Sequence, residues 1–261
     1  MMLLSVVIPF CDNDYMLLDR AINSIREHIK FNDYEIIVVD NRETKKEEKV
    51  SLKNMKVISK GYNIYTFESR RFGCQNSHGT YIWNFDADDE MIGDLFEEDI
   101  KDGYDFLQVY YLHDENTKPR PAPLLKRYPP NMFGPCVWSR LYKKDLLKKI
   151  YTRLEKPILV PKFEDRILFD FVMSYNPKYE YIERPIYMYN HSISTTNTRL
   201  MEKVDKIGME GYTYPYQILG KPSIAEDLKR KVGSMYQKLK KAEERKCQNL
   251  KESNNLNTQE F

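Results

Sequence analysis

Two short apolar runs, separated by an amphipathic segment, constrain the fold of this chain more than any other feature. SVVIPF at residues 5–10 and EIIVVD at residues 35–40 are rich in β-branched residues and have the length of strands buried on both faces. Between them, apolar residues recur at spacings of three and four over residues 15–29, which predicts a helix with one buried stripe. A strand, a helix and a strand form a βαβ unit with a right-handed crossover. The chain is therefore expected to begin a parallel α/β sheet.

The same patterns predict further elements along the chain. Strands are expected at residues 55–60, 80–89, 104–113 and 179–189, and helices at residues 69–77, 132–150 and 163–175. Residues 118–130 combine several prolines with basic side chains, so a basic loop is expected there. Pro222 begins a capping-box pattern, and apolar residues follow it at helical spacing, which predicts a helix of about 25 residues.

Composition excludes several classes of protein. Of 261 residues, 41% are hydrophobic and 31% are charged, and the mean hydropathy is -0.65, as in soluble globular proteins rather than disordered, fibrous or membrane-spanning ones. The net charge of +2 conceals an asymmetry. Residues 1–220 carry 31 Lys and Arg against 33 Asp and Glu, whereas residues 221–251 carry ten against four. A slightly acidic domain is thus followed by a basic helix.

The cysteines and the N-terminal sequence indicate the cellular compartment. Four dispersed cysteines show no CxxC or Cys/His spacing for zinc, so they are expected to be reduced thiols. The apolar start has no basic region and soon meets Pro9, so no signal peptide is expected. No run has the length of a transmembrane helix. The protein is therefore expected in the cytoplasm, with any membrane contact peripheral at the inner face.

An acidic segment follows the predicted strand at residues 80–89. FDADDE, residues 85–90, places four carboxylates in five residues, which repel one another unless a cation lies between them. Hard oxygen ligands suit Mg²⁺ or Mn²⁺, and the D-x-D spacing lets Asp86 and Asp88 project alike. Such a metal would bridge the protein to diphosphate oxygens. The alternative is a solvated acidic loop.

Six segments in one order resemble the family-2 glycosyltransferases of the GT-A fold. They are SVVIPF, EIIVVD, SRRFGCQNSHGTYIWNFDADDE, WSRLYKKDLL, EDRILFDFV and YMYNHSIS, and they span residues 3–198. The resemblance implies an α/β fold with a Rossmann-like, mostly parallel central sheet flanked by helices, here with a C-terminal helical extension. It also implies that the chain is a transferase that uses a nucleotide sugar.

The resemblance implies roles for residues on the donor side. Pro9 would form the floor of the nucleotide pocket, and Asp40 would contact the base or ribose. Arg70 would approach the nucleotide or diphosphate, and Asp86 would lie near the ribose. After the position of Asp40 the family has a second Asp and Gly-Ser, whereas residues 41–43 here are Asn-Arg-Glu. This departure leaves the base specificity open.

The resemblance also implies metal and catalytic residues. Asp88 would bind the metal, and His191 matches a late metal ligand or diphosphate contact, with a structural histidine as the alternative. Asp165 matches the catalytic base. A helix N-terminus favours the carboxylate form, so Asp165 is expected to be ionised at neutral pH. Glu164 and Trp138 fall on the sugar and acceptor side, and core packing is the alternative for the tryptophan.

The expected function is an inverting, metal-dependent transfer of a sugar from a nucleotide-sugar donor, a UDP-sugar, to a hydroxyl acceptor. The cofactor is Mn²⁺ or Mg²⁺, and the acceptor is a surface glycan or a lipid-linked saccharide. The alternatives are transfer onto a hydroxylated base in DNA, transfer onto a protein hydroxyl, and a non-catalytic protein that binds nucleotide sugars.

Three regions are expected along the chain. Residues 1–215 form the GT-A domain, with a nucleotide-sugar-binding half (1–113) and an acceptor-binding half (114–215). A basic amphipathic helical extension occupies residues 216–252, and a disordered tail occupies residues 253–261. The extension suits an anionic membrane, nucleic acid, or a second copy in a homodimer; a merely solvated helix is the alternative.

Overall fold

Buried β-branched runs form the centre of the fold. The computed structural model describes residues 2–11, 15–42, 48–52, 54–113, 136–190 and 200–257. The strands are β1 (Leu4–Phe10), β2 (Tyr34–Asp40), β3 (Glu48–Leu52), β4 (Met55–Ser59), β5 (Tyr81–Asn84), β6 (Glu90–Met91), β7 (Phe106–His113), β8 (Arg140–Lys143) and β9 (Tyr179–Tyr189). The helices are α1 (Tyr15–His28), α2 (Tyr65–Gln75), α3 (Lys144–Arg153), α4 (Glu164–Ser174), α5 (Leu200–Ile207), α6 (Thr213–Ile218) and α7 (Pro222–Asn257).

The strands form one sheet in the order β3-β4-β2-β1-β5-β8-β7-β9-β6. The strands β4, β2, β1 and β5 are parallel neighbours, which confirms the predicted α/β class and its Rossmann-like half. Beyond β5 the pairing is mixed: β8 is antiparallel to both β5 and β7, whereas β7 and β9 are parallel. The carboxyl ends of β1, β2 and β5 therefore lie along one edge of the sheet.

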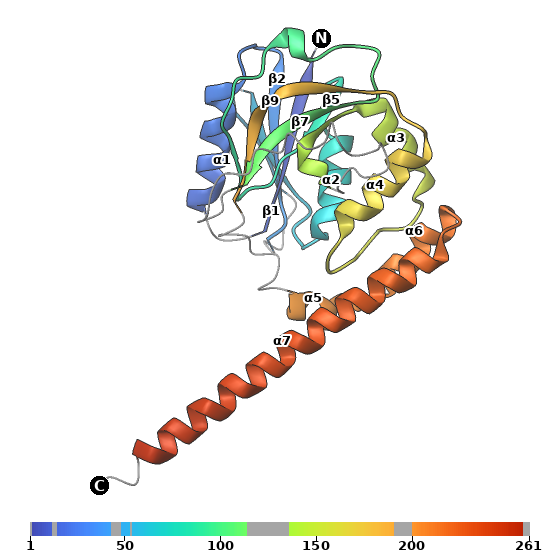
Figure 1. Ribbon diagram of the computed structural model, residues 1–261. Helices are drawn as coiled ribbons and strands as arrows, with labels where there is room; N and C mark the ends of the chain where they lie inside the picture. Colours follow the sequence, from blue (N-terminus) through green and yellow to red (C-terminus); the bar gives the residue numbers. More distant parts are fainter. Residues whose placement is uncertain are drawn as a thin grey trace. The chain divides into compact units, whose positions relative to one another are not determined.

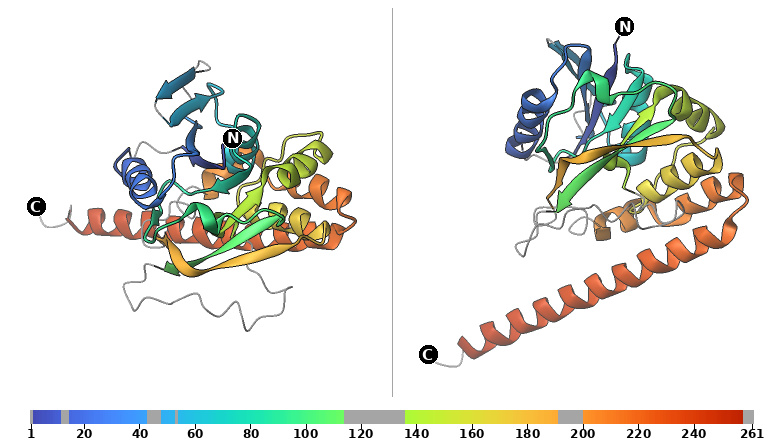
Figure 2. Two further views of the ribbon diagram at one scale, coloured as in Figure 1. Left: turned by 90° about the horizontal axis from the view of Figure 1, so that it is seen from above. Right: turned by 45° about the horizontal axis from the view of Figure 1, so that its top comes forward.

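Helices cover both faces of the sheet (Figures 1 and 2). The apolar stripe of α1, which includes Leu18, Ile22 and Ile25, packs with one face of β1, β2 and β5. The helix α2 packs on the other face, where Gly73 approaches β1 so closely that an added Cβ would lie 2.3 Å from a methyl group of Val7. This close approach brings the N-terminal half of α2 to the edge where the strands end.

Three strands, β3, β6 and β8, and several boundaries differ from the sequence predictions. The strand β3 lies in a polar stretch for which no strand is predicted, and β8 lies in the predicted helix over residues 132–150. The helix α2 begins four residues before the predicted start. The strand β5 ends at Asn84, so the acidic segment lies in a loop rather than on the strand. The strand β8 pairs with the distant strands β5 and β7, whereas β3 pairs with β4, its neighbour in sequence.

Contacts divide the chain into two compact units. One comprises residues 1–159 and 164–194, and the other comprises residues 160–163 and 195–261. The division falls near residue 195, whereas the sequence places it at residue 215. Within the second unit, α7 packs against α5 and α6 and runs to Asn257, five residues into the predicted tail. None of the helices in the described ranges is long and apolar enough to cross a bilayer.

Candidate active site

The residues that the resemblance assigns to donor binding lie at the carboxyl ends of the central strands. In the parallel register of β1 and β2, Pro9 pairs with Val39 and Phe10 with Asp40. On the other side of β1, the β5 strand leads directly into the loop that contains Asp86. In open α/β sheets, ligands bind outside the carboxyl ends of the strands, where the strand order reverses. Here the order reverses at β1, so the predicted donor residues lie where a nucleotide site is expected.

Arg70 connects the acidic loop that contains Asp86 to Asp165, the predicted catalytic base. Its guanidinium, only 4% exposed, extends from α2 and donates through Nη1 to Oδ1 of Asp165 at the start of α4. Through Nη2 it donates to Oδ1 of Asp86 at 2.9 Å, and Nη1 lies 3.9 Å from Oε1 of Glu164. The structure therefore brings Arg70, Asp86, Glu164 and Asp165 into one cluster from three separate segments of sequence.

Burial controls the ionisation of this cluster. Burial raises the pKa of Asp165 to about 7; the Arg70 charge acts to lower it, and the nearby Glu164 charge raises it. Burial also raises the pKa of Asp86 to about 6, with Arg70 again opposing the change. Although burial acts to lower the pKa of Arg70, the surrounding carboxylates raise it overall. The sequence expectation that Asp165 is ionised at neutral pH is thus corrected: with a pKa of about 7 it is only partly ionised there, because desolvation outweighs the helix terminus.

The rest of the acidic loop is held by β9. The hydroxyl of Tyr187 donates to Oδ2 of Asp89, and the main-chain amide of Asn190 donates to Oδ1 at 2.7 Å. The same hydroxyl accepts from the Asp86 amide at 3.4 Å, and the side-chain amide of Asn190 donates to the Asp88 carbonyl at 2.9 Å. Asp89 is thus a buried anchor of the loop. Neither Tyr187 nor Asn190 is singled out by the sequence prediction, although both lie in the quoted segment YMYNHSIS.

The carboxylates of this loop differ in their fitness to bind a metal. Asp86 is paired with Arg70, Asp89 accepts hydrogen bonds from Tyr187 and Asn190, and Glu90 pairs with Arg20. Asp88 is the metal ligand that the resemblance implies. Over the described ranges, no three His, Cys, Asp or Glu side chains gather as a metal site. Mg²⁺ commonly takes one or two carboxylates and completes its shell with phosphate oxygens and water. The residues therefore fit an ion shared with a diphosphate rather than one enclosed by protein.

Asp40 is engaged by its own neighbour. Nε of Arg42 donates to Asp40 Oδ1 at 2.9 Å and to Oδ2 at 3.1 Å, and Nη2 donates to Oδ2 at 2.5 Å. The Arg42 amide also donates to Oδ1 at 2.9 Å. The Asp40 side chain is only 5% exposed. Arg42 is one of the residues that depart from the family pattern, and sequence reasoning assigns it no role.

Trp138 lies in the core beneath the site. It is 5% exposed, and its ring stacks on those of Tyr187 and Tyr189 at centroid distances of 4.7 and 5.1 Å. Its carbonyl accepts a hydrogen bond from Nε1 of Trp83 at 2.6 Å. Because neighbouring rings cover it, the structure favours core packing over a sugar platform for this residue. His191 and the loop over residues 118–130 lie outside the described residues.

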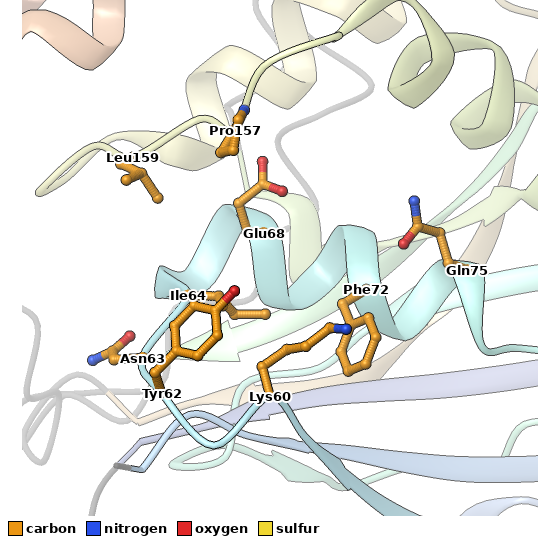
Figure 3. Close-up of a pocket in the computed structure, with 9 residues that line it drawn as sticks. All are labelled: Lys60, Tyr62, Asn63, Ile64, Glu68, Phe72, Gln75, Pro157 and Leu159. Carbon is orange, nitrogen blue, oxygen red and sulfur yellow. The ribbon is translucent and has the colours of Figure 1, made fainter. Parts of the chain in front are cut away.

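A separate pocket lies on the outer face of α2 (Figure 3). Its volume is about 260 Å³, and its lining includes Tyr62, Glu68, Phe72 and Pro157. Arg70 lies half a helical turn from Glu68, so it points to the opposite side of α2. This pocket is therefore distinct from the Arg70 cluster.

The chain belongs to glycosyl transferase family 2, whose model matches residues 5–154. It is therefore a glycosyltransferase, and the resemblance inferred from sequence is confirmed. Comparison with curated proteins gives no match.

Solved structures of S. aureus TarS have a similar fold. TarS 1-349 in complex with UDP is 17% identical, with a TM-score of 0.55, and the match covers 84% of this chain and 71% of that one. TarS 1-349 in complex with UDP-GlcNAc is 16% identical, with a TM-score of 0.53 and coverages of 84% and 72%. A longer TarS structure, 16% identical with a TM-score of 0.54, is covered over 43% of its length and this chain over 84%. At these identities the comparison supports the GT-A fold alone.

Proposed function

We propose that this glycosyltransferase moves a sugar from a UDP-sugar to a hydroxyl acceptor with inversion at the anomeric carbon. The observation that carries the proposal is the cluster in which Arg70 joins Asp86 to Asp165 at the edge of the sheet. The positive charge of Arg70, held between Asp86 and Asp165, suits a reaction in which negative charge develops on a diphosphate leaving group. The UDP and UDP-GlcNAc complexes of TarS support a uridine donor.

Asp165 is the general base in this proposal. Arg70 donates to its Oδ1, whereas the contact that Oδ2 receives from the residues the structure describes is a long one, 3.4 Å from the Val137 amide, so Oδ2 is the oxygen that accepts the proton. A pKa of about 7 balances the ionised fraction against basicity at neutral pH. The acceptor oxygen then attacks from the face opposite the diphosphate, which inverts the anomeric configuration. Glu164 lies beside this base on the acceptor side.

The nucleotide-sugar donor is held by residues at the carboxyl ends of the strands together with Arg70. Pro9 forms the floor of the nucleotide pocket, Asp86 lies near the ribose, and Arg70 contacts the diphosphate. Asp88, with His191 as a second ligand, would hold Mn²⁺ or Mg²⁺. That ion, when bound, neutralises charge on the departing diphosphate. The Tyr187 hydroxyl keeps the Asp86 amide and the Asp89 carboxylate in place during the reaction.

The acceptor is proposed to be a surface glycan or a lipid-linked saccharide, reached at the inner face of the membrane from the cytoplasm. Residues 221–251 carry ten Lys and Arg against four Asp and Glu, and α7 contains most of them. A cationic helix suits an anionic membrane or a polyanionic acceptor. Residues 1–215, with donor and acceptor halves, would carry out the transfer. DNA or protein hydroxyls and a homodimer remain the alternatives.

Release of UDP from a panel of UDP-sugars, with Mn²⁺ present, tests the proposed reaction. Asp165→Asn keeps the size of the side chain but removes the base, and a loss of at least about a hundredfold is expected. Arg26→Gln, on the exposed surface of α1, is the matched control and should keep full activity. Turnover that survives Asp165→Asn would contradict the role of this residue, and retention of configuration in the product would contradict inversion.

A further inference from the structure

Arg42 places a cation just after β2, at the position where the family pattern has glycine, and Asn41 stands where that pattern has the second Asp. Two of its guanidinium nitrogens and its main-chain amide donate to the Asp40 carboxylate. Asp40 is 5% exposed, whereas Arg42 is 30% exposed. The carboxylate is therefore covered by the arginine, and the arginine forms the surface that a ligand would meet.

Aromatic rings fix the plane of this guanidinium. Its carbon atom lies 5.0 Å from the ring centroid of Tyr15 and 5.7 Å from that of Phe10. These two rings contact each other at 5.5 Å, and Tyr15 is 50% exposed. An arginine held by a carboxylate fork and by aromatic faces is preorganised, so it loses little entropy on binding a ligand.

One edge of the guanidinium remains available. Among the residues that the structure describes, none accepts a hydrogen bond from Nη1 of Arg42. Arginine has only donors, so this edge can recognise only hydrogen-bond acceptors. Uracil presents two carbonyl oxygens, whereas the uracil N3–H needs an acceptor such as a carboxylate.

We propose that Arg42, rather than Asp40, recognises the base of the donor nucleotide, by donating from Nη1 to a carbonyl oxygen of uracil. Asp40 is then a positioning residue that holds the guanidinium. This inference rests on the proposed use of a uridine donor. It makes the departure at residues 41–43 a change in how the base is recognised, because a guanidinium can only donate to the base, whereas a carboxylate can only accept from it.

Calorimetric titration of UDP into the wild-type protein and variants, with Mn²⁺ present, tests this assignment. Arg42→Met keeps the apolar stem and removes the donors, so the Kd for UDP should rise about ten- to a hundredfold, the range for a charge-assisted hydrogen bond. Arg42→Lys keeps the charge without the fork and should recover only part of the affinity. Arg26→Gln, on the exposed surface of α1, is the matched control and should leave the Kd unchanged.

Asp40→Asn separates a positioning role from direct recognition. If Asp40 acts only through Arg42, the double variant Asp40→Asn with Arg42→Met binds UDP no more weakly than Arg42→Met alone. In addition, UDP methylated at N3 should bind the wild type about as well as UDP does, because both carbonyl oxygens remain. Circular dichroism and thermal unfolding of each variant establish that it is folded.

Two results would overturn the inference in different ways. If Asp40 reads the base, Arg42→Met exposes its carboxylate, so UDP binding stays the same or tightens while Asp40→Asn weakens it. That outcome refutes the role of Arg42 and leaves the proposed function intact. A folded wild-type protein that binds no UDP refutes the proposed donor, and the inference fails with it.

Discussion

Replacing Arg70 with methionine tests whether this arginine sets the ionisation of Asp165, the proposed catalytic base. The change removes the guanidinium that donates to Asp165 and Asp86 but keeps an unbranched side chain. Asp165 accepts a proton only when it is ionised, so activity should rise with pH through its pKa, about 7. Because Arg70 acts to lower this pKa, its loss raises the pKa and moves the acid limb of the pH profile upward.

The size of the effect follows from the groups that surround Asp165. Burial, Glu164 and Asp86 all raise its pKa, and Arg70 is the neighbouring charge that lowers it. An opposite charge at this range lowers a carboxyl pKa by about one to three units, so the midpoint should move upward by about as much. At pH 7 the ionised fraction of Asp165 would then fall about five- to five-hundredfold. Lost contacts to the diphosphate lower activity further at every pH.

The assay is kcat/KM for UDP release, measured from about pH 5.5 to about pH 9.5 in wild type, Arg70→Met and Arg70→Lys. Arg70→Lys keeps the positive charge, so its acid limb should stay near that of the wild type even where its overall rate is lower. An acid limb at the same pH in Arg70→Met and the wild type would refute the reasoning. Circular dichroism confirms that the compared variants are folded.

Three further changes have defined outcomes. Asp88→Ala should abolish the dependence of UDP release on added Mn²⁺ and lower activity at least about a hundredfold, which a metal titration measures. Glu35→Ala leaves the ammonium of Lys56, 3.0 Å away and buried, without its carboxylate, so the free energy of unfolding should fall by about 3–5 kcal/mol in urea titration. Gly73→Ala overpacks the contact of α2 with β1, so the free energy of unfolding should fall by about 1–3 kcal/mol in the same titration. At Gly233 an added Cβ would lie 3.8 Å from the nearest atom, so Gly233→Ala should leave the free energy of unfolding unchanged or raise it.

Local pattern is sufficient for the first half of the sheet but not for the second. The elements β1, α1 and β2 match their predicted ranges within one or two residues, because each carries its own apolar pattern. The strand β8, RLYK, has no alternation of its own and is extended because it pairs with β5 and β7. The strand β3 pairs with β4, which begins three residues after β3 ends, so its partner is local, but its short sequence EKVSL lies in a polar stretch and has no buried strand pattern. The strand β8 instead depends on partners that a local window does not contain.

The site divides in a similar way. Sequence motifs single out Arg70, Asp86 and Asp165 separately, but not that one guanidinium joins both carboxylates across 95 residues of sequence. The ionisation of Asp165 was predicted from its helix terminus, a local feature. Burial, which depends on the whole fold, is larger and reverses the expectation. From sequence, Arg42 is only a departure from the family pattern, because its hydrogen bonds to Asp40 are known only from the structure.

Tyr187 connects the aromatic core to the acidic loop. Tyr187 packs its ring on Trp138 and on Phe85, the residue that precedes the acidic loop. Its hydroxyl donates to Asp89 and accepts from the Asp86 amide. Trp138, which the resemblance links to the sugar, is thus part of the aromatic packing around Tyr187, the residue that holds this loop. The position of the loop that carries Asp88 therefore depends on a strand about 100 residues further along the chain.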